Sequence, residues 1–131
     1  MEKVKRFEDL VVWSESRILC KEIHALFKEK KRFSEIPISN QIIRSSGSIM
    51  DNIAEGFERG GNKELLQYLW ISKASAGECR SQLYRAFDCD LINEGEFLAL
   101  KQNVEKLSVG IYRLINHIRS SNMQGQKYIG R

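Results

Sequence analysis

The stretch Gln41–Asn62, QIIRSSGSIMDNIAEGFERGGN, decides the fold. An apolar stripe at helical spacing runs through it: Ile42, Ser46, Ile49 and Ile53. Its middle holds the poor helix formers Ser45–Ser48, which cost roughly 2 kcal/mol together relative to alanine. Ser46 falls at the centre of the apolar face and Gly47 near its edge. We therefore expect small residues here to let a neighbouring helix approach closely, so that packing offsets the lost propensity.

Three further segments share this periodicity, and together the four are expected at about residues 9–30, 38–59, 62–88 and 93–119. The first segment has the stripe Val12, Ser16, Leu19, Ile23 and Leu26. The third has Leu65, Leu69, Ser72, Ala76, Cys79, Leu83 and Phe87, and the fourth has Phe97, Val104, Leu107, Ile111, Leu114 and Ile118. These stripes predict four amphipathic helices, because apolar residues three and four apart share a helix face.

Local signals indicate where the helices begin and end. Asp9 and Asn62 are expected to cap the first and third helices, and Asn93 with Glu96 forms a capping box for the fourth. One of the glycines at 60–61 is expected to take a left-handed conformation at the end of the second helix.

Long helices joined by short loops predict an all-α protein, an antiparallel up-down-up-down four-helix bundle. The expected organisation is an N-terminal lead-in (1–8), a bundle domain (9–119) and a flexible C-terminal tail (120–131). Small residues also gather at mid-length of the third helix, at 72–77, and we expect this patch to face the small patch of the second helix. A second apolar flank on the first helix (Trp13, Cys20, Phe27) suggests contact with another subunit.

Composition excludes several classes of protein. The net charge is +4 and the pI about 9.0, which is compatible with nucleic acid but does not require it. The three cysteines, Cys20, Cys79 and Cys89, lack a CxxC spacing, so neither a disulfide framework nor a metal site is expected. His24 and His117 stand alone, and no Walker A, GxSxG or GxGxxG pattern occurs. We expect a cytoplasmic protein with no cofactor, no enzyme activity and no membrane span.

Polar residues on the second helix carry two interpretations. Gln41, Arg44, Ser48, Asn52, Glu55 and Arg59 recur at spacings of three and four on the face opposite the apolar stripe. They form either a solvated helix face or a polar network at a subunit interface, in which Glu78 would pair with Arg44 or Arg59.

A basic cluster at the end of the first helix also has two interpretations. Lys28, Lys30, Lys31 and Arg32 either complement the helix dipole or bind phosphate.

Three motifs resemble one known family over about residues 6–118. RFEDLVVWSES is similar to the F-x-D-L-x-V-W opening of the 23S rRNA-intervening-sequence protein family. QIIRSSGSIMDNIAEGFERG is similar to its central Q-I-x-R-x-x-x-S-I-x-x-N-I-A-E-G motif. ISKASAGECRSQL resembles its I-A-x-x-S-x-x-E-x-x-x-Q-L stretch, with Ser72 where alanine is commoner.

This resemblance implies a four-helix bundle that assembles as a homopentamer without an established enzyme activity. The fold is shared with the accessory variability determinant proteins of diversity-generating retroelements, which bind nucleic acid and a reverse transcriptase. The residues that match the family motif are Gln41, Arg44, Ser48, Asn52, Glu55, Gly56, Ser75 and Glu78.

The sequence therefore predicts a non-enzymatic oligomeric scaffold that binds RNA or DNA with little sequence specificity. The expected nucleic-acid contacts are Lys28, Lys30, Lys31, Arg32, Lys127 and Arg131. The alternative is a protein-interaction module, for example a reverse transcriptase accessory subunit, whose basic charge is incidental.

Overall fold

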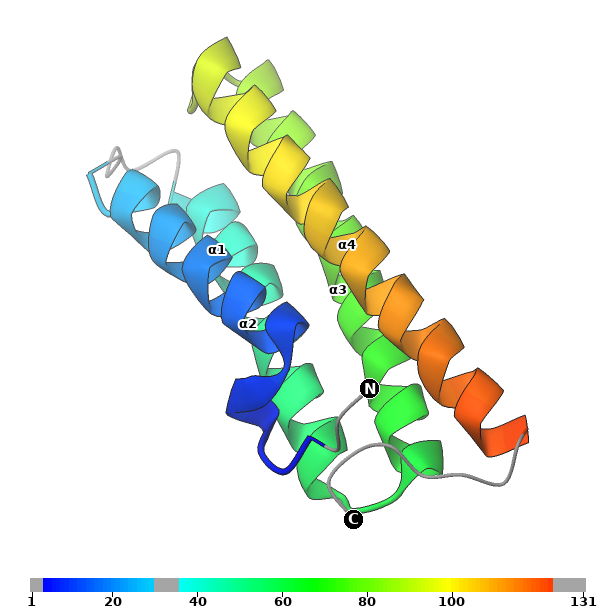
Figure 1. Ribbon diagram of the computed structural model, residues 1–131. Coiled ribbons are helices and arrows are strands. Elements are labelled where there is room, and N and C mark those ends of the chain that lie inside the picture. The colour runs from blue at the N-terminus through cyan, green and yellow to red at the C-terminus, as the bar shows by residue number, and fades with distance from the viewer. Residues whose placement is uncertain (1–3, 30–35, 124–131) are drawn as a thin grey trace.

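The fold was taken from a computed structural model, which describes residues 4–29 and 36–123. A short 3-10 turn, η1 (Phe7–Asp9), precedes four α-helices. The helices are α1 (Val11–Phe27), α2 (Ile36–Glu58), α3 (Asn62–Asp88) and α4 (Glu94–Met123). They run up and down in turn, and each packs against its two neighbours (Figure 1). The predicted antiparallel four-helix bundle is confirmed, whereas the homopentamer stays a prediction.

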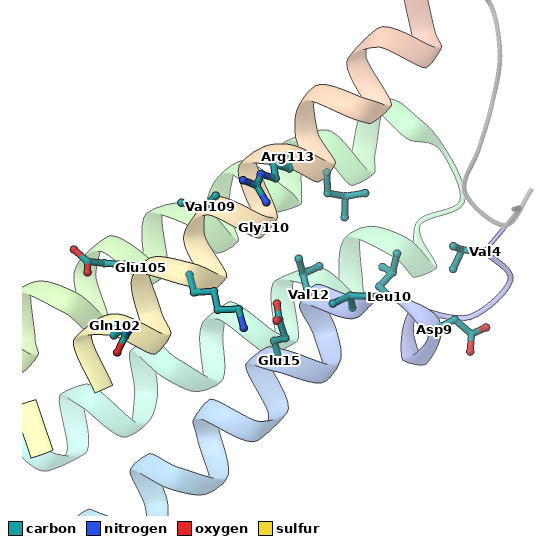
Figure 2. A pocket seen from close by; sticks show the side chains of 13 residues that line it. Val4, Asp9, Leu10, Val12, Glu15, Gln102, Glu105, Val109, Gly110 and Arg113 are labelled. Atoms are coloured by element: carbon teal, nitrogen blue, oxygen red, sulfur yellow. The ribbon is translucent and has the colours of Figure 1, made fainter. Parts of the chain in front are cut away.

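The four helix pairs differ in how closely they pack. α2 and α3 form the most extensive pair, and α1 and α4 form the least extensive one. Where α1 begins, a groove of about 870 Å³ separates it from α4 (Figure 2). The seam between α1 and α4 is therefore the most open side of the bundle.

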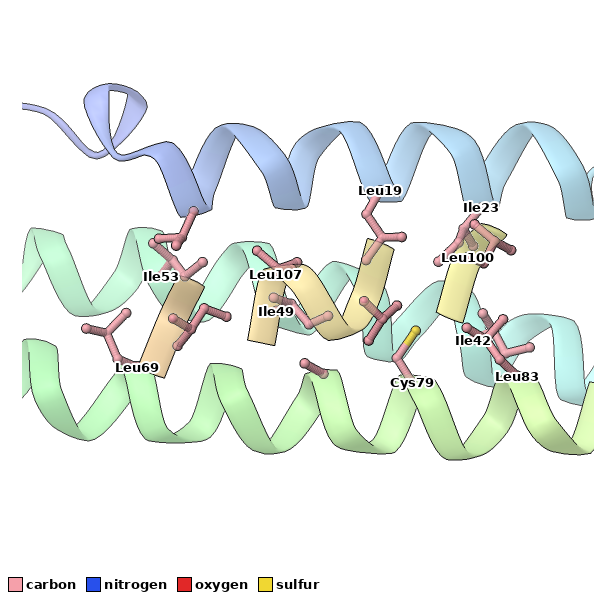
Figure 3. Packing of buried hydrophobic residues seen from close by; sticks show 14 of the residues in the cluster. Leu19, Ile23, Ile42, Ile49, Ile53, Leu69, Cys79, Leu83, Leu100 and Leu107 are labelled. Atoms are coloured by element: carbon pink, nitrogen blue, oxygen red, sulfur yellow. The ribbon is translucent and has the colours of Figure 1, made fainter. Parts of the chain in front are cut away.

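Most of the core comes from the predicted stripes, which turn inward from all four helices (Figure 3). Ile42, Ile49 and Ile53 of α2 are fully buried, as are Leu69 and Leu83 of α3. Residues from α1 and α4 complete the same cluster: Leu19, Ile23, Leu100, Leu107, Ile111, Ile115 and Ile118. The helical periodicity of the sequence thus gave most of the inward face of each helix. Three predicted stripe residues are only partly buried: Leu26, Phe87 and Leu114. Buried residues that the predicted stripes left out include Phe27, Ala86, Leu100 and Ile115.

Small side chains in this core adjoin α1 as well as α3. Ser46 is buried, and the Cys20 thiol of α1 donates a hydrogen bond of 3.3 Å to its backbone carbonyl. Burial raises the pKa of Cys79 to about 11, so its thiol is expected to be unreactive. Phe27 is buried within its own chain, so it does not contribute to an exposed flank for another subunit.

Two of the expected N-caps are wrong. Leu10 and Gly61 occupy the N-cap positions of α1 and α3, so neither Asp9 nor Asn62 is a cap. Asp9 belongs instead to the 3-10 turn, and Asn62 is the first residue of its helix.

The capping box of α4 is present. The Asn93 backbone N–H donates to Glu96 Oε1 at 2.9 Å, and the Glu96 N–H donates to Asn93 Oδ1 at 2.8 Å. Gly60 ends α2 with a φ of 96°, a left-handed conformation that glycine adopts without steric cost.

Some helix bounds differ from those expected. α4 continues to Met123, past the boundary at residue 119, because Ser121 is buried and its hydroxyl donates to the His117 carbonyl. α2 begins at Ile36, with Pro37 in its first turn, where a missing backbone N–H is tolerated. Residues 124–131 of the expected tail lie outside the described residues.

Candidate interaction face on α2 and α3

Small polar side chains form a hydrogen-bonded seam between α2 and α3. The Ser48 and Ser75 hydroxyls lie 2.9 Å apart, and the Ser72 hydroxyl donates to the Ile49 carbonyl at 2.8 Å. The prediction that the two small patches face each other is confirmed. Short side chains allow this pair of helices to approach, and the hydroxyls satisfy the polar groups that the approach buries.

Asn52 extends this seam along α2. Its Nδ2 donates to the Ser48 carbonyl at 2.8 Å and to Ser48 Oγ at 3.0 Å. Asn52 therefore fixes the Ser48 hydroxyl, which in turn contacts Ser75. These three motif residues form one polar network within the chain.

Glu55 and Gly56 meet Tyr68 near the end of α2. Glu55 Oε2 accepts hydrogen bonds from Arg59 at 2.9 Å and from the Tyr68 hydroxyl at 3.1 Å. The bond from Arg59, followed by that from Tyr68, lowers the pKa of the Glu55 carboxyl. A Cβ at Gly56 would lie 2.5 Å from Tyr68 Cβ, so glycine permits the close approach of α2 and α3 here.

The remaining motif residues reach towards solvent. Gln41 accepts a hydrogen bond of 2.9 Å from Arg85 of α3. Arg44 and Glu78 are exposed, and neither forms an ion pair with another of the residues described in the structure. Arg59 pairs with Glu55 rather than with Glu78, so the pairing of Glu78 considered from the sequence does not occur within one chain.

A shallow hollow of about 420 Å³ lies on the outer surface of α2 over Gly47, and we call it the Gly47 hollow. It is lined by Ile43, Arg44, Gly47, Ser48, Asp51, Asn52 and Glu55. A Cβ built on Gly47 meets nothing within 4 Å, which overturns the expectation that Gly47 serves close packing inside the bundle. Ile43, at the edge of the hollow, is 38% exposed.

The sequence reasoning missed three residues of this face. The buried Ser45 hydroxyl donates to Gln82 Oε1 at 2.7 Å, and Tyr68 covers both Glu55 and Gly56. Tyr68, Ser75 and Gln82 recur at seven residues on α3, a spacing that could have placed them on one helix face.

The candidate phosphate-binding residues are only partly described. Lys28 is exposed just beyond the end of α1. Lys30, Lys31, Arg32, Lys127 and Arg131 lie outside the described residues, so a basic cluster stays a prediction. The turn between α3 and α4 lies at the same end of the bundle as Lys28 (Figure 1). This turn and the helix ends beside it carry four acidic residues: Asp88, Asp90, Glu94 and Glu96.

Neither a metal site nor a membrane-spanning helix is found in the described part of the chain. Within residues 4–29 and 36–123, no group of three or more histidine, cysteine, aspartate or glutamate side chains is placed to hold a metal ion. None of the helices in these ranges combines the length and the apolar character needed to cross a membrane.

The fold and the α2–α3 face define a class: a small helical bundle whose organised polar groups lie on one helix pair. Within that class, residues 8–113 match the family described as 23S rRNA-intervening sequence protein. The chain belongs to that family, as its motifs suggested.

A solved structure supports the fold independently. The chain is similar to the crystal structure of a protein with unknown function from the S23 ribosomal protein family of Bacteroides thetaiotaomicron VPI-5482. The TM-score is 0.72 at 22% sequence identity, covering 80% of this chain and 98% of that one. At this identity the likeness shows the fold alone. A comparison with curated proteins finds no match.

Proposed function

We propose that this protein is a non-enzymatic scaffold that assembles with further copies of itself, as a homopentamer, through the Gly47 hollow. The observation that carries the proposal is that Gly47 opens into a hollow lined by family-motif residues, which are Arg44, Ser48, Asn52 and Glu55. Glycine in a helix interior costs about 1 kcal/mol relative to alanine, and nothing in the same chain occupies the space beside it. A helix of another copy that approaches closely at this point would use that space.

Neighbouring residues are suited to such a contact. Ile43 on α2 and Ile71 on α3 are both large, apolar and partly exposed. Arg44 and Glu78 leave charges of opposite sign available to a second copy, since neither is paired with a described residue. Apolar contacts framed by polar and charged groups are typical of protein–protein interfaces.

Replacing Gly47 with tryptophan tests this proposal. The indole has room in the isolated chain, so the helical circular dichroism spectrum should change little, but it would fill the Gly47 hollow and exclude a second copy. Light scattering behind a sizing column should give about five times 15.2 kDa for the wild type and about 15.2 kDa for the variant.

Gly77 on α3 provides the matched control. A Cβ there also meets nothing within 4 Å, but Gly77 lies towards α4, among Lys73, Arg80 and Ser108. Gly77→Trp should therefore leave the assembly intact. A wild type that is monomeric at micromolar concentration, or a Gly47→Trp variant that assembles normally, would contradict the proposal.

Nucleic-acid binding is a second candidate function, and the basic net charge favours it. Five chains of +4 each would carry about +20, and attraction to phosphate would be largely independent of sequence. The family description refers to an intervening sequence in 23S rRNA, which makes RNA the first ligand to test.

Such binding should weaken steeply with salt, because counterions are released when phosphates are neutralised. The affinity for a labelled single-stranded RNA should fall by at least about tenfold between roughly 50 and 200 mM salt. Changing Lys28, Lys30, Lys31 and Arg32 together to glutamine should weaken binding without dissociating the oligomer. If fluorescence anisotropy detects no binding of RNA or duplex DNA at about 50 mM salt, this second function fails.

A further inference from the structure

The groove between α1 and α4 is a second surface. It shares no lining residue with the Gly47 hollow. Figure 2 shows its apolar side chains, contributed by the start of α1 and the middle of α4. Val12 of α1 and Leu10, its N-cap residue, line one side, and Gly110 and Leu114 line it from α4. A Cβ at Gly110 would lie 3.3 Å from Val12 Cγ1, so glycine allows the two helices to approach without filling the space beside them.

Apolar side chains also stand exposed at the edges of this groove. Val11 on α1 is 70% exposed and Val109 on α4 is 49% exposed. An apolar floor with exposed apolar edges is the kind of patch that marks an interaction site.

The two rims of the groove carry opposite charges. Asp9 and Glu15 lie on the α1 side, whereas Lys106 and Arg113 lie on the α4 side. None of these four side chains forms an ion pair or hydrogen bond with another residue in the described ranges. Glu105 also lines the α4 side, but its carboxylate is paired with Arg80 and Lys101. The groove thus offers an acidic rim and a basic rim, both available to an external partner.

The length of the groove suits a short helix. Its α4 wall runs from Gln102 to Leu114, which is about 18 Å at the helical rise, or between three and four turns. A smaller hollow of about 250 Å³ continues it along α1 past Ile18. A hydrogen bond of 3.2 Å from Asn103 to Glu22 joins the two helices there.

We infer that this groove binds an amphipathic α-helix of another protein. The partner would have an apolar stripe, a basic flank facing α1 and an acidic flank facing α4. A helix satisfies its own backbone hydrogen bonds, whereas an extended peptide would bring unpaired N–H and C=O groups against apolar side chains. The charged flanks of such a helix would complement the charges on the two rims of the groove.

Three synthetic peptides of about four turns test the inference on the full chain. All carry the same leucine stripe at helical spacing; one has lysine on one flank and glutamate on the other, one has lysine on both and one has glutamate on both. By fluorescence anisotropy, the mixed peptide should bind roughly tenfold more tightly than either control. A helix with mixed flanks meets both rims favourably in one of its two directions, so the comparison does not depend on direction.

Variants of exposed rim residues make the test specific. Lys106→Glu with Arg113→Glu turns both rims acidic and should transfer the preference to the peptide with lysine on both flanks. Val109→Glu should abolish binding of the mixed peptide. All three residues are exposed, so the unfolding curves should match the wild type. Equal binding of the three peptides, absence of binding, or an unchanged preference in the double variant would overturn the inference.

The size of the assembly separates this inference from the proposed function. If the wild type is an oligomer and the Val109→Glu variant is a monomer, the groove is a contact between copies of this chain and the inference is overturned. If the wild type is a monomer, the proposed assembly fails, but peptide binding to the groove is still measured on that monomer.

Discussion

Replacing Ile49 with alanine is expected to lower the free energy of unfolding by about 2–5 kcal/mol. Ile49 is fully buried at mid-length of α2, and the Ser72 hydroxyl of α3 donates to its carbonyl. The truncation removes buried apolar surface and leaves a cavity that close packing on both sides prevents from collapsing. Chemical unfolding followed by circular dichroism measures the loss.

Ile43 is the matched control on the same helix. Its side chain is exposed at the edge of the Gly47 hollow, so Ile43→Ala should change the stability of a single chain by about 0.5 kcal/mol or less. Equal losses at the two positions would show that the helical phase assigned to α2 is wrong.

Replacing Gly56 with valine is expected to cost about 3 kcal/mol. The new Cβ would fall 2.5 Å from Tyr68 Cβ and 3.4 Å from Leu65 Cδ1. Tyr68 Cβ is the stem of its side chain and moves only with the backbone of α3. The two helices must therefore separate, and the contacts along their seam weaken.

The corresponding change at Gly47 should have the opposite sign. Nothing lies within 4 Å of a Cβ at Gly47, and valine has a better helix propensity than glycine, by about 0.5 kcal/mol. Gly47→Val should thus stabilise the isolated chain slightly while it weakens the proposed assembly. A thermal melt of both variants at low protein concentration compares them directly, and a stabilised Gly56→Val would refute the close approach at Tyr68.

The fold could be predicted because its signals are local or periodic. Ile42, Ile49 and Ile53 share a face whatever surrounds them, since 3.6 residues per turn fix their relative directions. The capping box of Asn93 and Glu96 joins residues three apart and needs no distant partner. The expected caps at Asp9 and Asn62 failed because the chain enters each helix through a neighbouring residue.

The candidate site could be predicted only in part. Motif residues on α2 were found from the sequence, but their partners lie on α3, and composition did not indicate which of them would meet. Ser48 and Ser75, for example, are separated by 27 positions, and their hydroxyl oxygens lie 2.9 Å apart. The packing of α2 against α3 decides this pairing.

By itself, the sequence determined that this protein is a bundle of four amphipathic helices, most of the residues that face its core, and the family to which it belongs. Only the tertiary structure decided what two glycines of one helix do. Gly56 is enclosed by Tyr68, and Gly47 faces open space. The groove between α1 and α4 likewise exists because these helices, far apart in the chain, pack less closely than their neighbours. Periodicity fixes the direction of a side chain about its own helix axis, whereas the distance to a second helix depends on every side chain between the two.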